Sequence, residues 1–402
     1  MEQIITSILD TDLYKISMQN FVYNFHPNAK VKYVFKCRNK DVKLGFLAPL
    51  INDQIKQMKS IQMTNEEREY VVSLGFLSND YLDCLSNYRF NPEEVSCYAE
   101  YERKDYFEAN PHPDSDLVIE IEGLWHKAIL WEVPLLAIVN QLYFKERSDF
   151  RTVEGAGIRN LKDKINLIRN HPQFKFAEFG TRRRYSKDWQ EYVVKEMLKY
   201  IPNNIIGTSN VSLARKYRIK SIGTQAHEIF SAYLAFVDNI RNAQKGALHD
   251  WLAHYDTPTG AKLGIALTDT FGSKSFFKDF NSVLANSYDG IRHDSGCPVE
   301  FAEKAIAHYK KLGIDPRTKS LVFSDGLTVK RALELFELFT GRIAVSFGIG
   351  TSLTNDLNVT PLNIVIKLIE VNNTPVVKIS DEPNKAIGNK EMIETVIRAY
   401  GD

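Results

Sequence analysis

The chain has little cysteine and none of the spacings that cysteine chemistry needs. Its 402 residues contain four cysteines, namely Cys37, Cys84, Cys97 and Cys297. They are scattered without a CxxC spacing, which argues against a zinc site and against a disulfide framework. Their free distribution fits a reducing compartment.

An excess of charge of one sign is also missing. The chain carries 51 basic and 50 acidic side chains, so its formal net charge at pH 7 is +1. No global field would therefore draw it to nucleic acid or to an anionic membrane. Any anionic ligand must be held by local groups.

Long hydrophobic runs and the common nucleotide motifs are absent as well. No run of about 18 apolar residues occurs, and the N-terminus lacks the basic segment and apolar core of a signal peptide. Neither a Walker A pattern nor GxGxxG is present, so a nucleotide would have to be bound in another way. We expect a soluble, cytoplasmic protein.

The first third of the chain predicts an antiparallel sheet with helices. Alternating polar and apolar residues indicate strands over 30–38, 95–101 and 116–122, and helical spacing covers 46–58 and 65–74. Residues 5–24 predict a turn and an amphipathic helix. The mostly apolar segment 124–144 is interrupted by polar residues, which favours a buried helix or helix pair that joins two domains.

From residue 174 onward the pattern changes. Seven short apolar runs each end in small or polar residues, and most are separated by room for a helix: 174–178, 204–206, 219–222, 262–267, 288–291, 321–323 and 343–345. This alternation indicates a (β/α) barrel, regular or irregular, with functional groups at the C-terminal ends of its strands. A doubly wound open sheet is the main alternative. Residues 362–371 and 374–380 predict two strands that return to the first domain.

One of these strand ends carries a histidine. In KSIGTQAHEIF, residues 220–230, Thr224 is a good N-cap and places His227 in the first turn of a helix. A helix N-terminus favours an anion, and a largely neutral imidazole can act as nucleophile or base. The pattern is compatible both with phosphate chemistry and with a histidine that has only a structural role.

Polar residues follow other strand ends. Arg182, Arg183 and Arg184 come just after Phe179, where guanidinium groups suit phosphate oxygens and the ring offers a face for an aromatic ligand. A solvated basic turn is the alternative. Three aspartates that follow apolar runs, Asp269, Asp294 and Asp325, are candidates to hold Mg²⁺ through water, bind ribose hydroxyls or orient His227. An aspartate in this place also often caps the next helix.

Two glycine-bearing loops follow late strands, Ser324-Asp325-Gly326 and Gly348-Ile349-Gly350-Thr351. Glycine permits close approach of the backbone, and paired late loops of a barrel often hold a phosphate. GxGT alone is a weak signal. Taken together, the aromatic side chain, arginines, carboxylates, glycine loops and histidine suit the transfer of a phosphorylated sugar to an aromatic acceptor.

The motifs of the chain resemble those of the nicotinate phosphoribosyltransferase family. The segments that carry the resemblance are TDLYKISMQ, FAEFGTRRRYS, GTSNVSLARKY, GTQAHE, LTDTFGSKSFF, GIRHDSGCP, VFSDGL and SFGIGTSLTND, in consistent order along nearly the full chain. The resemblance implies that nicotinate and 5-phosphoribosyl diphosphate form nicotinate mononucleotide and diphosphate in NAD salvage, coupled to ATP hydrolysis. It implies an irregular type II phosphoribosyltransferase barrel, residues 136–362, and an α/β sandwich domain, residues 1–135, to which residues 363–402 return.

The resemblance also implies roles for individual residues. His227 resembles the histidine that ATP phosphorylates transiently, and Asp269 the carboxylate near it. Phe179 resembles the aromatic residue that stacks on the pyridine ring, and Arg182 the arginine beside the ring. Tyr14 resembles a tyrosine that reaches the site from a neighbouring subunit, which implies a homodimer.

At the sugar and phosphate side, Arg292 and Asp294 resemble the contacts to ribose and phosphate. The phosphate-binding residues implied are Asp325, Gly326, Gly348, Gly350 and Thr351. Mg²⁺ is expected as cofactor, held through water by Asp294 and Asp325, and ATP is expected as co-substrate. Ser209 stands where nicotinamide-using relatives carry an aspartate, and a neutral residue there would favour nicotinate.

Other activities stay open at this point. Nicotinamide or quinolinate could replace nicotinate on the same fold, although quinolinate would call for further basic groups. A phosphate-binding barrel lyase or isomerase with His227 as base is less favoured, as is a non-catalytic binding protein. The turn-rich loop 380–388 contains Lys385, which could meet an anion.

Overall fold

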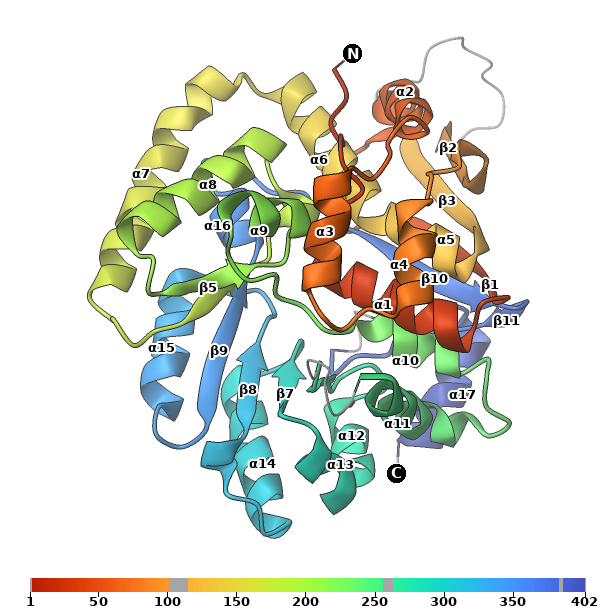
Figure 1. The fold of residues 1–402 in the computed structure, drawn as a ribbon, viewed down its shortest axis with the longest axis vertical. Helices are drawn as coiled ribbons and strands as arrows, with labels where there is room; N and C mark the ends of the chain where they lie inside the picture. Colours follow the sequence, from red (N-terminus) through yellow and green to blue (C-terminus); the bar gives the residue numbers. More distant parts are fainter. Residues whose placement is uncertain (1, 101–114, 256–262, 383–385, 402) are drawn as a thin grey trace.

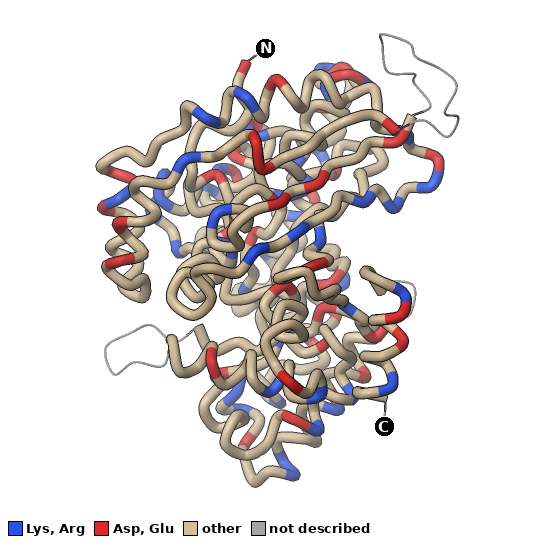
Figure 2. Tube along the Cα trace, turned by 90° about the vertical axis from the view of Figure 1, so that its right-hand side faces the viewer, with Lys and Arg blue, Asp and Glu red and all other residues tan. Residues whose placement is uncertain are grey.

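The computed structural model describes residues 2–100, 115–255, 263–382 and 386–401, and it contains one antiparallel and one parallel sheet with helices around both (Figure 1). Lys385 and residues 110–114 of the predicted proline-bearing loop lie outside the described residues. Basic and acidic residues are interspersed along the chain (Figure 2), as the near-zero net charge leads one to expect.

The antiparallel sheet combines both parts of the chain that the sequence placed together. Its strands, in spatial order, are β11 (Thr374–Pro375), β10 (Ile364–Val371), β1 (Lys30–Cys37), β3 (Asp116–Leu124) and β2 (Val95–Glu100). The central strand β1 pairs with β3 on one side and with β10 on the other, with Phe35 opposite Ile366. Val31 and Tyr33 point inward and are buried, which explains the alternating pattern of β1.

Helices and turns cover this sheet and lead to the second one. They are α1 (Leu13–Phe25), η1 (Gly45–Leu47), α2 (Ala48–Met58), α3 (Asn65–Ser73), α4 (Asn79–Ser86), η2 (Pro92–Glu94), α5 (Trp125–Ala128), η3 (Ile129–Trp131) and α6 (Glu132–Arg147). The prediction of an amphipathic first helix was wrong, because all residues from Leu13 to Val22 are buried. Hydrogen bonds from Ser17 to the Thr224 carbonyl and from Asn20 to Tyr255 show that α1 is enclosed by later parts of the chain.

The second sheet is parallel and holds six of the seven predicted runs. Its order is β5 (Ile205–Thr208), β4 (Phe176–Glu178), β9 (Ala344–Ile349), β8 (Ser320–Phe323), β7 (Gly290–His293) and β6 (Ile265–Leu267). The seventh run, 219–222, was predicted as a strand but makes only one bridge, between Ser221 and Thr208. α1 packs closely against the residue that follows this run, since a Cβ at Gly223 would lie 2.9 Å from the backbone nitrogen of Tyr14.

No ladder joins β5 to β6 among the described residues, so the sheet is not a closed barrel of paired strands. The segment before α10 lies between these two edges. The Ile222 N–H donates to the Thr208 carbonyl of β5 at 2.9 Å, and the Gln225 amide donates to the Ile265 carbonyl of β6 at 3.1 Å. The parallel sheet is thus bridged by irregular chain where a further strand was expected.

Helices flank the parallel sheet and end the chain. They are α7 (Phe150–Arg169), η4 (Thr181–Arg183), α8 (Lys187–Tyr200), α9 (Val211–Tyr217), α10 (His227–Tyr233), η5 (Ile240–Asn242), α11 (Ala243–Tyr255), α12 (Ser273–Asp279), α13 (Ser282–Ser287), α14 (Pro298–Lys311), η6 (Pro316–Thr318), α15 (Val329–Phe339), α16 (Thr351–Thr354) and α17 (Lys390–Tyr400). The last helix is anchored at η5, where the Tyr400 hydroxyl donates to the Ile240 carbonyl at 2.7 Å.

All four cysteines are free, as their spacing predicted. Within the described ranges, no helix has both the length and the apolar character required to cross a membrane.

Candidate active site

His227 is the first residue of α10, and the structure confirms that it lies in the first turn of a helix. The predicted cap is wrong: Ala226, not Thr224, precedes the helix, and no side chain caps it. The Thr224 hydroxyl instead donates to the Ile265 carbonyl of β6 at 3.4 Å. With only seven residues, α10 contributes a weak dipole, so nearby side chains must dominate the electrostatics around His227.

Three charged groups surround the imidazole at Nε2. Asp294 Oδ2 lies 2.8 Å away, Lys378 Nζ 2.8 Å and Asp269 Oδ1 3.7 Å, while Nδ1 faces the Thr270 hydroxyl at 3.0 Å. Burial lowers the pKa of His227 to about 4, and Lys378 acts in the same direction. The ring is therefore neutral at pH 7, as the sequence analysis assumed. We call His227, Asp269, Asp294 and Lys378 the histidine end of the site.

The two carboxylates of this end are held in place by serine hydroxyls. Ser295 donates to Asp269 at 2.6 Å, and Ser324 donates to Asp294 at 2.6 Å. Burial alone would raise the pKa of Asp294, but His227 and Arg292 hold it well below the usual range. Asp269 also has a lowered pKa, since the effect of His227 and Lys378 exceeds that of burial.

The third predicted aspartate lies apart from this group. Among the described residues, the side chains able to hold a metal ion together are His227, Asp269 and Asp294, whose ligand atoms lie within 4.8 Å of one another. Burial lowers the pKa values of Arg38 and Arg183, and Asp325 acts on both in the opposite direction. All three aspartates follow the C-terminal ends of the adjacent parallel strands β6, β7 and β8, as expected, but only Asp269 and Asp294 belong to the group around His227.

Sequence reasoning missed two lysines near the C-terminus. Lys378 contacts His227 and lies 3.4 Å from Asp269 Oδ2. Lys367 is on β10, where burial lowers its pKa to about 8, and Glu132 and Lys378 also act on it. The apolar run of 362–371 indicates a strand. The sequence did not show that this strand borders the site.

The three arginines after β4, expected to form one anion-binding group, do three different things. Arg184 makes a buried two-bond pair with Asp10, at 2.7 and 2.8 Å. Arg183 donates to Asn363 and to the Ile364 carbonyl at the start of β10. Only Arg182 is left to meet a ligand, because η4 turns successive side chains in different directions.

Arg182 is 41% exposed and lies between groups from the N-terminal part of the chain. Its guanidinium is 5.8 Å from the centre of the Tyr14 ring, 3.6 Å from Glu132 Oε1 and 3.9 Å from Asp12 Oδ2. The charge of Asp294 also acts to raise the pKa of Arg182, so Arg182 interacts electrostatically with the histidine end. We call Tyr14, Phe179, Arg182 and Ser209 the arginine end of the site.

Two expectations about the arginine end are corrected. Tyr14 was expected to reach the site of a neighbouring subunit, but its ring lies beside Arg182 of its own chain, because α1 is enclosed by the same molecule. Ser209 was expected, as a neutral residue, to avoid repelling the nicotinate carboxylate, but its hydroxyl donates to Asp12 Oδ1 at 2.7 Å, so a carboxyl group lies beside it. Burial raises the pKa of Asp12.

Phe179 is placed by two of the predicted glycines. A Cβ at Gly348 would lie 3.3 Å from the Phe179 ring, and one at Gly350 would lie 2.7 Å from its carbonyl oxygen. These glycines therefore allow β4 and β9 to carry the aromatic side chain between them. Gly326 has φ +58 with nothing near a Cβ, and Thr351 begins α16.

Glu178 precedes Phe179 and anchors the turn from inside. It is fully buried and accepts hydrogen bonds from the Thr208 hydroxyl at 2.5 Å, the Gln190 amide at 3.1 Å and the Gly180 N–H. Burial raises its pKa to about 7. No cation pairs with it in the contacts described, so its charge depends on these donors.

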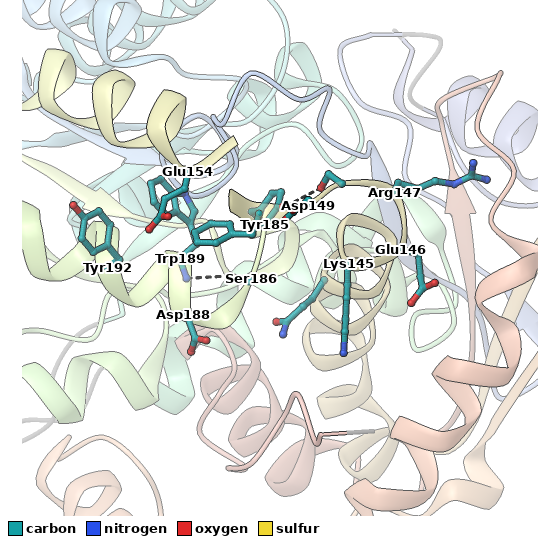
Figure 3. A pocket seen from close by; sticks show the side chains of 13 residues that line it. Lys145, Glu146, Arg147, Asp149, Glu154, Tyr185, Ser186, Asp188, Trp189 and Tyr192 are labelled. Atoms are coloured by element: carbon teal, nitrogen blue, oxygen red, sulfur yellow. Dashed lines mark hydrogen bonds between the residues drawn. The ribbon is translucent and has the colours of Figure 1, made fainter. Parts of the chain in front are cut away.

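A hollow of about 980 Å³ lies elsewhere, between the end of α6 and the start of α8. Figure 3 shows the aromatic rings of Tyr185, Trp189 and Tyr192 on one side and Lys145 and Glu146 on the other. Neither the histidine end nor the arginine end contributes to its lining. We therefore assign the chemistry to the group around His227, where neutral imidazole, carboxylates and lysines converge.

The fold and the site define an α/β protein in which a neutral histidine, two carboxylates and a lysine converge. Comparison with known families makes the assignment specific. Residues 174–402 match the model of the nicotinate phosphoribosyltransferase (NAPRTase) family, and residues 9–140 match that of the NAPRTase N-terminal domain. A nicotinate phosphoribosyltransferase of Proteus mirabilis is 43% identical over 407 residues, covering 99% of this chain and 96% of the relative. The chain therefore belongs to the nicotinate phosphoribosyltransferase family and is an enzyme.

Solved structures agree with this assignment. The crystal structure of nicotinate phosphoribosyltransferase from Porphyromonas gingivalis is similar with a TM-score of 0.88 and 36% identity, covering 99% of this chain and all of the other. That of a putative nicotinate phosphoribosyltransferase from Saccharomyces cerevisiae has a TM-score of 0.89 and 32% identity, covering 100% of this chain and 99% of the other.

Proposed function

We propose that the protein joins nicotinate to 5-phosphoribosyl diphosphate, giving nicotinate mononucleotide and diphosphate in NAD salvage. The observation that carries this proposal is the pairing of two unlike ends in one site. A half-exposed arginine beside an aromatic ring suits a pyridine carboxylate. The lysine-bearing histidine end suits phosphates, and Arg182 feels Asp294 across the site.

The chemistry needs positioning and charge stabilisation more than proton transfer. The pyridine nitrogen is already a nucleophile, and breakage of the bond from ribose C1 to diphosphate builds negative charge on the leaving group. Lys367, Lys378 and Arg292 are cations of the site that can meet that charge. Asp294 and Arg292 remain our candidates for the ribose and phosphate contacts.

We propose that ATP phosphorylates His227 transiently. The neutral ring keeps a lone pair on one of its two nitrogens, and that nitrogen can attack the terminal phosphorus of ATP with release of ADP. The ammonium of Lys378 then lies where the transferred phosphoryl group would carry its charge. The glycine loops at Gly326, Gly348 and Gly350, with Asp325 and Thr351, remain proposed phosphate contacts.

Mg²⁺ fits this site through oxygen ligands and water. Asp269 Oδ1 is buried without a hydrogen-bond partner, and carboxylate oxygens are the ligands that Mg²⁺ prefers. The geometry favours Asp269 and Asp294 over the predicted pair of Asp294 and Asp325, since Asp325 lies outside the group. When bound, Mg²⁺ would neutralise charge on the diphosphate.

The finer architecture and the setting are also proposals. The bridge that residues 219–225 make between β5 and β6 supports an irregular barrel over residues 136–362. The β1–β10 pairing supports a sandwich domain of residues 1–135 to which residues 363–402 return. The free cysteines support a cytoplasmic location. A homodimer is proposed only on family grounds. The position of Tyr14 does not call for a second subunit, because its ring lies beside Arg182 of the same chain.

Nicotinamide is the second candidate acceptor. Asp12 places a carboxyl oxygen next to Ser209, where it could accept from an amide. Incubation of the purified chain with 5-phosphoribosyl diphosphate, Mg²⁺ and either nicotinate or nicotinamide, with and without ATP, tests the proposal. We expect nicotinate mononucleotide as the main product and faster formation with ATP. Turnover of nicotinamide in preference to nicotinate would reverse the assignment of the acceptor.

A further inference from the structure

The residue after His227 is tied to three elements of the N-terminal part of the chain. Glu228 accepts hydrogen bonds from Lys15 Nζ at 2.5 Å, from the Tyr33 hydroxyl at 2.6 Å and from the Trp125 indole at 2.7 Å. These donors come from α1, β1 and α5. The side chain of Glu228 is only 8% exposed, so the contacts fix the first turn of α10 from behind.

The same lysine reaches toward the arginine end. Lys15 Nζ lies 2.5 Å from Glu132 Oε2, and the other oxygen of Glu132 lies 3.6 Å from Arg182. Lys15 is fully buried, and the side chain of Glu132 is 9% exposed. Burial would lower the pKa of Lys15, but its two carboxylates raise it, so the ammonium is charged. One cation thus joins a carboxylate beside Arg182 to the carboxylate beside His227.

A charged triad of this kind is a poor source of net stability, because taking the charges out of water costs about as much as their attraction returns. Its best-attested use is to hold a particular arrangement. Removal of the central ammonium would leave two buried carboxylates without the cation that they share, and the remaining contacts would no longer hold them in this arrangement. Each would then release the group that it fixes, α10 on one side and Arg182 on the other.

We propose that Lys15 is a positioning residue that couples the two ends of the site, through Glu132 to Arg182 and through Glu228 to His227. The inference rests on the proposed roles of Arg182 and His227. Glu132 holds Arg182, Glu228 holds the first turn of α10, and Lys15 holds both carboxylates, so loss of Lys15 affects both ends at once.

Three substitutions in the full chain, each of which replaces a charged residue by an uncharged one, test the contact through Glu132 and the contact through Glu228 separately. We call these two contacts the arms. Glu228→Gln should lower the ratio of turnover with ATP to turnover without ATP and leave the KM for nicotinate close to that of the wild type. Glu132→Gln should raise the KM for nicotinate and leave the ATP ratio nearly unchanged. Lys15→Met should do both, each by about 10-fold, within the range of coupling between sites. Arg241→Met, which removes a partly buried ion pair with Asp279 outside both ends of the site, is the matched control.

A merely structural role for Lys15 gives a different result. In that case Lys15→Met lowers turnover with and without ATP by the same factor, and Glu132→Gln and Glu228→Gln behave like the wild type. That outcome overturns the inference. Should Lys15→Met not fold, Tyr33→Phe decides, because it removes one donor to Glu228 and no charge: a lowered ATP ratio supports the coupling, and a wild-type ratio overturns it. A wild-type protein without any ATP response would instead overturn the proposed phosphohistidine, and the coupling with it.

Discussion

The two ends of the site are built in different ways. At the histidine end, four side chains contact one another at 2.8 to 3.7 Å, and their carboxylates are fixed by serines. At the arginine end, Arg182 is 41% exposed and its nearest carboxylates are 3.6 and 3.9 Å away. The histidine end is thus preorganised for charge that develops during reaction, whereas the arginine end is free to close on a ligand.

Loss of His227 should have the largest effect, and only on the histidine end. His227→Ala should abolish the stimulation by ATP, because no phosphoryl acceptor remains, and should leave slow ATP-independent turnover. A product assay with and without ATP measures this. The exposed His249→Ala is the control and should respond like the wild type. An ATP response that persists in His227→Ala would remove the role proposed for this residue.

Glu178 should make the arginine end sensitive to pH. Its pKa of about 7 in the folded protein exceeds its ordinary value, so its contribution to stability is full at acidic pH and is lost as pH rises through 7. From this shift we expect the free energy of unfolding to fall by about 3 kcal/mol between pH 4.5 and pH 8. Urea unfolding at several pH values measures it, and Glu178→Gln should flatten the curve. The exposed Glu303→Gln should not, and an unchanged slope in Glu178→Gln would contradict the assignment.

Removal of the ammonium beside His227 should weaken the handling of phosphate. Lys378→Met leaves Asp269 and Asp294 without their nearby cation, so we expect kcat/KM for 5-phosphoribosyl diphosphate to fall by about 100-fold, which is about 2.7 kcal/mol. The KM for nicotinate should change little. The exposed Lys274→Met serves as control. A defect confined to nicotinate would show that the two ends are not separated as described.

A smaller effect is expected at the arginine end. Arg182→Gln should raise the KM for nicotinate by about 10-fold, the cost of one charged hydrogen bond to a carboxylate, and should affect 5-phosphoribosyl diphosphate less. Arg183→Gln is a matched control from the same turn, because its guanidinium faces Asn363. Equal effects of the two substitutions would mean that the basic turn acts as a whole.

The strand ends were predictable because local patterns determine them. Six of seven apolar runs became strands of one parallel sheet, and parallel strands bring their carboxyl ends to one edge. Asp269, Asp294 and His227 therefore met as expected. The seventh run makes only one bridge, and the residue after it, Gly223, packs closely against Tyr14, a contact between distant parts of the chain that no local pattern encodes.

The sequence by itself determined the class of fold, the family and the residue types of the site, because hydrophobic periodicity and motif order are local properties. Tertiary structure alone decided which of three arginines faces the site, that Tyr14 lies beside Arg182 of its own chain, and that Lys378 and Asp12 belong to the site. Each of these depends on the register of strands or the burial of α1. Such long-range packing brings Lys15 and Glu228, which are 213 residues apart, within hydrogen-bonding distance.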